Sequence, residues 1–146
     1  MAEDSRDEPA IQGVDVDGMS RYLEGCDVVF AMLFGSRARG TARESSDVDV
    51  ALQFPAWMTP KERFRRRNRI DAELQEYADG FVDVSDIEEL PLPVARAALQ
   101  DGFRLVGDGR RIDTHRERIE AEYEASASER ERERREFIDR LARGEL

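Results

Sequence analysis

The chain has 146 residues, of which 38% are charged and 40% are hydrophobic, and its formal net charge at pH 7 is -10. This length suits one compact domain with a core of its own. Because nucleic acids and anionic membranes are themselves negative, the charge argues against a general affinity for either. No apolar run approaches the roughly 20 residues that cross a bilayer, and the polar stretch from Met1 to Pro9 does not resemble a secretion signal. We therefore expect a cytoplasmic protein.

The first third of the chain predicts a tail, a helix and two strands. Residues 1–13 have few apolar positions, which is typical of a flexible acidic tail. A short helix is expected over 16–23, followed by Gly25 as a helix-ending residue. The unbroken apolar run at 28–34 predicts a strand that is buried on both faces. Residues 47–52 alternate between two kinds of side chain and predict a second strand.

The rest of the chain continues the alternation of helices and strands. Five elements are expected, namely a helix at 60–78, a strand at 81–85, a helix at 93–101, a strand at 103–106 and a helix from about 111 to 141. This pattern predicts an α/β fold with a mixed sheet of about four strands and flanking helices. We assign residues 14–110 to the folded domain and residues 111–146 to a long C-terminal helix. The charged part of that helix has few apolar residues, so we expect it to face a partner.

A glycine turn after the first strand has the composition of a phosphate-binding site. Gly35 lets the backbone turn sharply and lets a phosphate approach, because no Cβ intervenes. The backbone N–H groups that follow, together with the Ser36 hydroxyl, can form a concavity for anions. Arg37 and Arg39 can neutralise phosphate oxygens with paired hydrogen bonds. These four residues are the candidate triphosphate-binding residues.

Acidic residues on the second and third strands form a candidate metal site. Asp47 and Asp49 are two positions apart on a strand, so their side chains emerge on one face, about 6–7 Å apart at the Cα atoms. Two ionised carboxylates so close together repel each other unless a cation binds. Mg²⁺ prefers such hard oxygen ligands. Asp83 lies at the centre of the third strand and can complete a site for two ions, with Asp86 as the alternative third acid.

The stretch that joins these features resembles a known family. Residues 35–52 read GSRARGTARESSDVDVAL, in which Gly-Ser, a ten-residue spacer and Asp-x-Asp follow one another. The pattern is similar to that of the polymerase-beta-like nucleotidyltransferases, and especially to their minimal branch, the MntA-type antitoxins. The resemblance covers about 28–106 and, more loosely, the terminal helices.

The resemblance implies a fold, an activity and a partner. Members of the minimal branch transfer AMP from ATP to a tyrosine of a HEPN-domain ribonuclease toxin, using two Mg²⁺ ions. By the same resemblance, Asp47, Asp49 and Asp83 would bind metal, Asp83 would also activate the acceptor hydroxyl, and Ser36 would contact the triphosphate. Two alternatives stay open, an antitoxin that neutralises its toxin by binding alone and a transferase for a small molecule such as an antibiotic.

Other conspicuous residues have plainer interpretations. The arginine-rich run at 63–69 lies within a predicted helix flanked by acids, which favours a solvated face over RNA binding. Phe54 and Trp57 follow the second strand and are interpreted first as core or lid residues. His115, the single histidine, is interpreted as a surface residue.

Overall fold

The computed structural model describes residues 11–35 and 47–144. Their strands form one sheet in the order β3-β2-β1-β4. The central strand β1 runs antiparallel to both of its neighbours, β2 and β4, whereas β2 and β3 run parallel. The strands are β1 (Phe30–Phe34), β2 (Val48–Gln53), β3 (Val82–Asp86) and β4 (Phe103–Gly107). The mixed four-stranded sheet expected from the sequence is confirmed.

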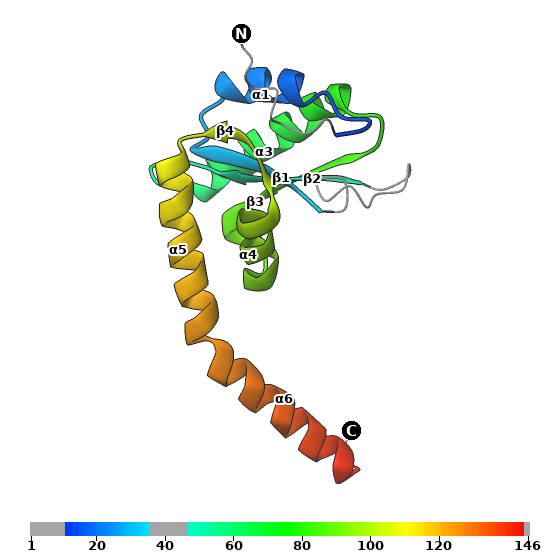
Figure 1. Ribbon diagram of the computed structural model, residues 1–146, viewed down its shortest axis with the longest axis vertical. Helices are drawn as coiled ribbons and strands as arrows, with labels where there is room; N and C mark the ends of the chain where they lie inside the picture. The colour runs from blue at the N-terminus through cyan, green and yellow to red at the C-terminus, as the bar shows by residue number, and fades with distance from the viewer. Residues whose placement is uncertain (1–10, 36–46, 145–146) are drawn as a thin grey trace.

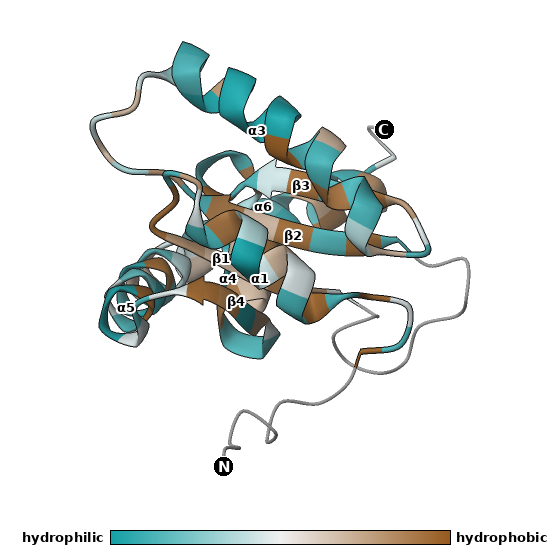
Figure 2. Ribbon diagram, turned by 90° about the horizontal axis from the view of Figure 1, so that it is seen from above, coloured by the Kyte–Doolittle hydropathy of each residue, from teal (hydrophilic) through white to brown (hydrophobic). Residues whose placement is uncertain are grey.

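Helices cover both faces of this sheet (Figure 1). One face packs against α1 (Val16–Glu24) and α3 (Pro60–Leu74), and the other packs against α4 (Leu92–Asp101) and α5 (Gly109–Ala125). Hydrophobic residues concentrate in the sheet, while the outer surface of α3 is largely hydrophilic (Figure 2). In the parts of the chain that the structure describes, no helix is both long enough and apolar enough to cross a membrane.

Strand alternation divides the core into two layers. Val48, Val50 and Leu52 of β2 join the hydrophobic cluster beneath α1 and α3. Ala51 points the other way and joins the cluster beneath α4 and α5. Because side chains alternate along a strand, Asp49 shares the face of Ala51. The candidate acids therefore lie on the face that α4 and α5 cover.

The helix expected at 60–78 is confirmed over most of its length. Its first turn carries a capping box, in which the Glu62 amide donates to the Thr59 hydroxyl at 3.1 Å and the Thr59 amide donates to the Glu62 carboxylate at 2.8 Å. The α-helical part ends at Leu74, and a short 3-10 helix, Gln75–Tyr77, completes the segment.

The helical segment expected from about 111 to 141 is confirmed, and a bend at Ser126 divides it into two helices. This residue separates α5 from α6 (Ala127–Ala142), and its hydroxyl donates to the Tyr123 carbonyl at 3.0 Å. Serine side chains that bond nearby backbone in this way compete with regular helix geometry. α5 buries Ile112 and Ile119 against the body, whereas α6 projects away from it (Figure 1).

Candidate active site

Asp49 and Asp83 lie next to each other in the sheet. The parallel register of β2 and β3 pairs Asp49 with Asp83, just as it pairs Val48 with Val82. Directly paired residues point to the same face, so both carboxylates project to one side. Asp47 stands immediately before β2 and is exposed. The structure thus brings together acids from two strands that are more than thirty positions apart in the chain.

Gly35 brings the end of β1 against the Asp49 carboxylate. Its backbone has φ 89°, a conformation that residues other than glycine rarely adopt. A Cβ atom on this residue would lie 2.5 Å from Asp49 Oδ2. The preceding residue, Phe34, is the register partner of Asp49 on β1. The positive φ therefore favours glycine at this turn, and the missing Cβ leaves space for the Asp49 carboxylate.

The close packing around Asp49 shifts the pKa of its carboxyl group. Burial raises the pKa of the Asp49 carboxyl above its usual range, and the negative charges of Asp83 and Asp47 raise this pKa further. All three candidate acids therefore interact at this point of the sheet.

This raised pKa predicts that the charge of Asp49 destabilises the protein in the absence of a cation. The pKa of Asp49 is higher in the folded chain than in the unfolded chain. Ionising Asp49 therefore lowers the free energy of unfolding as the pH rises from the ordinary pKa of about 3.9 towards the raised pKa, and has no such effect at lower pH. We expect Asp49→Asn to melt a few degrees above the wild type at neutral pH. Thermal melts in chelator from about pH 4 upwards should show the gap widening as the pH rises above the ordinary value, and then staying constant once the pH exceeds the raised pKa. The exposed control Asp101→Asn should show no such trend, and a gap independent of pH would contradict the interpretation.

The arrangement of the acids suits a hard cation that takes part of its ligands from a bound phosphate. It suits less well a site in which the protein supplies every ligand. Within residues 11–35 and 47–144, no group of three or more His, Cys, Asp or Glu side chains is already arranged around one point. Mg²⁺ needs only one or two carboxylates and completes its shell with water and phosphate oxygens. The paired carboxylates of Asp49 and Asp83 meet that requirement, and a cation would relieve their repulsion. Ser36, Arg37 and Arg39 lie outside the described residues.

Asp86 is occupied in a structural role. It is 3% exposed, and its carboxylate accepts from Arg63 Nε at 2.9 Å and from the Glu88 amide at 3.0 Å. Its register partner is Leu52, whose side chain lies in the cluster beneath α1 and α3. Asp86 therefore points to the opposite face from Asp83 and away from Asp49.

The arginine-rich run is only partly a solvated face. Arg63 binds Asp86, and Arg67 Nη1 donates to the Val84 carbonyl at 2.9 Å, so two members of the run hold α3 against β3. Arg65 and Arg69 are exposed, as the sequence suggested. The prediction was wrong for Arg63 and Arg67 because their partners, the Asp86 carboxylate and the Val84 carbonyl, are contributed by β3, which is distant in sequence.

The two aromatic residues that follow β2 and the single histidine lie away from the acids. Phe54 is buried, as expected of a core residue, whereas Trp57 is 66% exposed. The His115 ring packs edge-on against Phe30 with centroids 5.1 Å apart, and its Nδ1 lies 2.9 Å from the Arg111 carbonyl oxygen. The histidine therefore packs against the core as well as reaching the surface.

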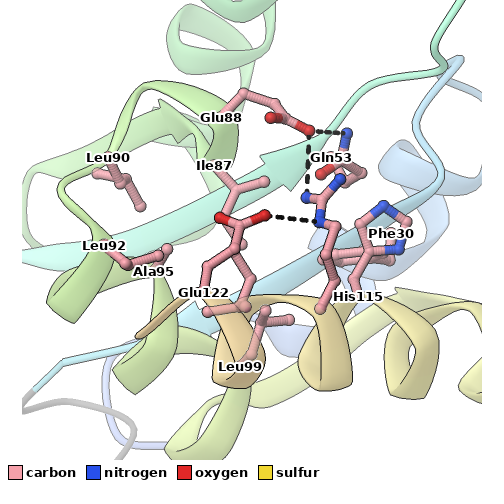
Figure 3. Close-up of a pocket in the computed structure, with 12 residues that line it drawn as sticks. Phe30, Gln53, Ile87, Glu88, Leu90, Leu92, Ala95, Leu99, His115 and Glu122 are labelled. Carbon is pink, nitrogen blue, oxygen red and sulfur yellow. Dashed lines mark hydrogen bonds and ion pairs between the residues drawn. The ribbon is translucent and has the colours of Figure 1, made fainter. Parts of the chain in front are cut away.

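A cavity of about 160 Å³ lies at the other end of the same sheet face. Figure 3 shows Gln53 and Phe30 among its lining side chains, with the Gln53 amide nitrogen donating to Glu88. Phe30 pairs with Gln53, four positions along the ladder from the pair Phe34 and Asp49. At about 3.3 Å per residue, that places the cavity roughly 13 Å from the acids along the strand. The cavity is therefore separate from the candidate active site.

A family model described as polymerase beta, nucleotidyltransferase matches residues 19–110, which is more than half of the chain. The chain belongs to this nucleotidyltransferase family. The match spans the glycine turn and all three candidate acids, so the family resemblance of the 35–52 motif is confirmed.

Solved structures share the fold of this nucleotidyltransferase over most of its length. A toxin-antitoxin structure with AMP-PNP has a TM-score of 0.69 and 18% identity, and the match covers 86% of this chain and 99% of that one. The toxin-antitoxin MntA-HepT gives a TM-score of 0.62 at 16% identity, with 85% and 97% covered. The tri-AMPylated Shewanella oneidensis HEPN toxin in complex with MNT antitoxin gives 0.60 at 15% identity, with 84% and 98% covered. At such identities the likeness shows the fold alone, and the curated proteins include no match to the chain.

Proposed function

We propose that this nucleotidyltransferase is an antitoxin that transfers AMP from ATP to a hydroxyl, most simply a tyrosine hydroxyl, of a HEPN-domain ribonuclease toxin. The pairing of Asp49 with Asp83 beside Gly35 carries the proposal, because two adjacent carboxylates next to a glycine turn suit the binding of a metal-bound triphosphate. Family membership supports the nucleotidyl transfer. The fold shared with toxin-antitoxin structures, one with AMP-PNP and one with a tri-AMPylated toxin, supports the nucleotide and the partner.

Each candidate residue has a role in this proposal. Asp47, Asp49 and Asp83 would hold two Mg²⁺ ions, and these ions would neutralise the charge that develops on phosphate oxygens. Gly35, which has no Cβ, would let the triphosphate approach the backbone beside Asp49, and Ser36, Arg37 and Arg39 would bind its oxygens. The half-buried position of Asp49 strengthens every electrostatic interaction made there.

The proposed step is a single displacement at the α-phosphorus of ATP. The acceptor oxygen forms a bond to that phosphorus, the bond to the bridging oxygen breaks, and pyrophosphate leaves with the electron pair. The proton of the acceptor hydroxyl passes to the Asp83 carboxylate, which acts as general base. Asp83 suits this role because its side chain is exposed, in contrast to its half-buried neighbour Asp49.

The projecting helix α6 offers a surface for the protein partner. It has no buried residue, yet it carries three large apolar side chains, Phe137, Ile138 and Leu141, that are 46%, 47% and 52% exposed. These residues lie at helical spacings of one, three and four, which places them on one side of the helix. The rest of its surface is charged, with ion pairs such as Arg132 to Glu129 at 3.2 Å. We therefore propose that the apolar side of α6 contacts the toxin.

We expect Phe137→Glu combined with Leu141→Glu to weaken binding of the toxin about a hundredfold or more. Burying two large apolar side chains in an interface contributes several kcal/mol, and a buried carboxylate opposes it. Isothermal titration calorimetry on the two purified proteins measures the effect. Phe64 on α3 is a similarly exposed ring, at 61% exposure, so Phe64→Glu is the control. This control variant should bind the toxin normally. Equal binding by the α6 variant and the wild type would show that the toxin docks elsewhere.

Transfer itself is tested with ATP labelled on the α-phosphate. The protein, Mg²⁺, the labelled nucleotide and the toxin are incubated together, and label on the toxin is followed by gel electrophoresis. We expect label to appear on the toxin only when Mg²⁺ and the wild-type protein are both present. Label that stays entirely in free nucleotide would contradict the proposed function.

A further inference from the structure

An exposed aromatic residue stands beside the candidate acids. Phe81 is 57% exposed and immediately precedes β3. Its carbonyl accepts from the Val48 amide at 2.8 Å, so the ladder between β2 and β3 continues through Phe81. A large apolar ring in this position gains little from folding, because more than half of it stays in water.

Strand alternation places Phe81 on the same face as Asp83. Val82 and Val84 point into the cluster beneath α1 and α3, so Asp83 points to the other face. Phe81 is two positions before Asp83 and follows the same alternation. Extending the register by one step sets Phe81 beside Asp47, as Asp83 is set beside Asp49. The ring therefore borders the group of acids.

The order of the strands indicates which reactant meets Phe81. Gly35, where the triphosphate would bind, ends β1, and the sheet order then passes through Asp49 on β2 to Asp83 on β3. In a phosphoryl or nucleotidyl displacement the attacking and leaving oxygens lie on opposite sides of the phosphorus. Pyrophosphate that leaves towards β1 therefore requires an acceptor that arrives from the side of β3. Among residues 11–35 and 47–144, β3 is also an edge strand of the sheet, which is the side from which an acceptor on a partner would arrive.

We propose that Phe81 binds the side chain that carries the acceptor hydroxyl, and that it favours an acceptor on an aromatic ring. The inference rests on the proposed function, since it assigns a residue to the acceptor side of that reaction. An aromatic acceptor can pack edge-on or offset against Phe81 while its hydroxyl reaches Asp83. An aliphatic hydroxyl would leave the ring of Phe81 without an aromatic partner. Phe81 thus contributes to selection of tyrosine over serine or threonine.

Steady-state kinetics with the toxin as acceptor test this assignment. Phe81→Ala should raise the KM for the toxin about tenfold and leave the KM for ATP unchanged, because only the acceptor contact is lost. Phe81→Tyr keeps the ring and should stay within about twofold of the wild type, whereas Phe81→Leu keeps the apolar character only and should resemble alanine. Phe64→Ala is the matched control, since its similarly exposed ring lies on α3 at the opposite face of the sheet. Melting temperatures of all variants should match the wild type closely.

The outcomes separate this inference from the function on which it rests. A raised KM for ATP with an unchanged KM for the toxin would show that Phe81 stacks on the base, and would overturn the inference. Equal effects of Phe81→Leu and Phe81→Tyr would overturn the claim of aromatic selection. Transfer by the wild type with no change in Phe81→Ala would overturn the inference and leave the proposed function intact. Absence of transfer by the wild type would overturn both.

Discussion

Replacing Asp47 and Asp49 together with asparagine is expected to reduce AMP transfer about a thousandfold or more. Asparagine keeps the size of each side chain but removes the charge that binds the cations, and loss of even one group that stabilises developing charge costs about a hundredfold to a thousandfold. The half-buried Asp49, whose pKa is raised by burial and by its acidic neighbours, should tolerate the loss of its charge without unfolding. The initial rate of label transfer from ATP to the toxin measures the effect.

The same variant distinguishes catalysis from neutralisation by contact. Its affinity for the toxin should equal that of the wild type, while the ribonuclease activity of the toxin should no longer be suppressed after the two proteins are separated. A control that removes two charges elsewhere, Asp101→Asn with Glu117→Gln, changes exposed residues and should transfer AMP normally. If the double asparagine variant protects against the toxin as well as the wild type does, binding alone is the mechanism.

Asp83→Asn and Asp86→Asn are expected to have opposite effects on activity and stability. The first removes the proposed general base and should lower the rate of transfer about a hundredfold to ten-thousandfold with little change in melting temperature. The second breaks the ion pair with Arg63, in which the Asp86 side chain is 2% exposed and the Arg63 side chain 24% exposed. Because Arg63 still reaches water, the loss of stability should be about 1–3 kcal/mol, below the cost of breaking a fully buried pair.

Chemical denaturation and transfer assays on the two variants decide which acid completes the site. Asp86→Asn should keep nearly normal transfer at a temperature where it remains folded. If instead Asp86→Asn is folded but inactive and Asp83→Asn is active, the roles of the two acids are exchanged.

Local sequence patterns predicted the elements of this fold well, because each pattern has a direct physical cause. The apolar run before Phe34 can be satisfied only by a strand buried on both faces. The capping residues Thr59 and Glu62 mark a helix start through their own hydrogen bonds. The bend at Ser126 could not be predicted from local sequence, because the charged helical pattern continues on both sides of this residue.

The candidate site was predicted in its composition but not in its arrangement. Spacing placed Asp47 and Asp49 on one strand face, but the pairing of Asp49 with Asp83 depends on the register of two strands separated by α3. Alternation along β3 could have separated Asp83 from Asp86, because three positions on a strand reverse the direction of the side chain. The contact of Arg63 with Asp86 is a tertiary interaction that no local pattern indicates.

Intact mass spectrometry of the toxin is the most direct test of the central claim, that the acids beside Gly35 transfer a nucleotide to a protein. The toxin is incubated with the wild type, Mg²⁺ and each nucleoside triphosphate in turn, and with the Asp47→Asn, Asp49→Asn variant in parallel. The account predicts a mass increase of one or more whole AMP groups with ATP and the wild type, and no increase with the variant or without Mg²⁺. An unmodified toxin in every reaction, or equal modification by the variant, would contradict it.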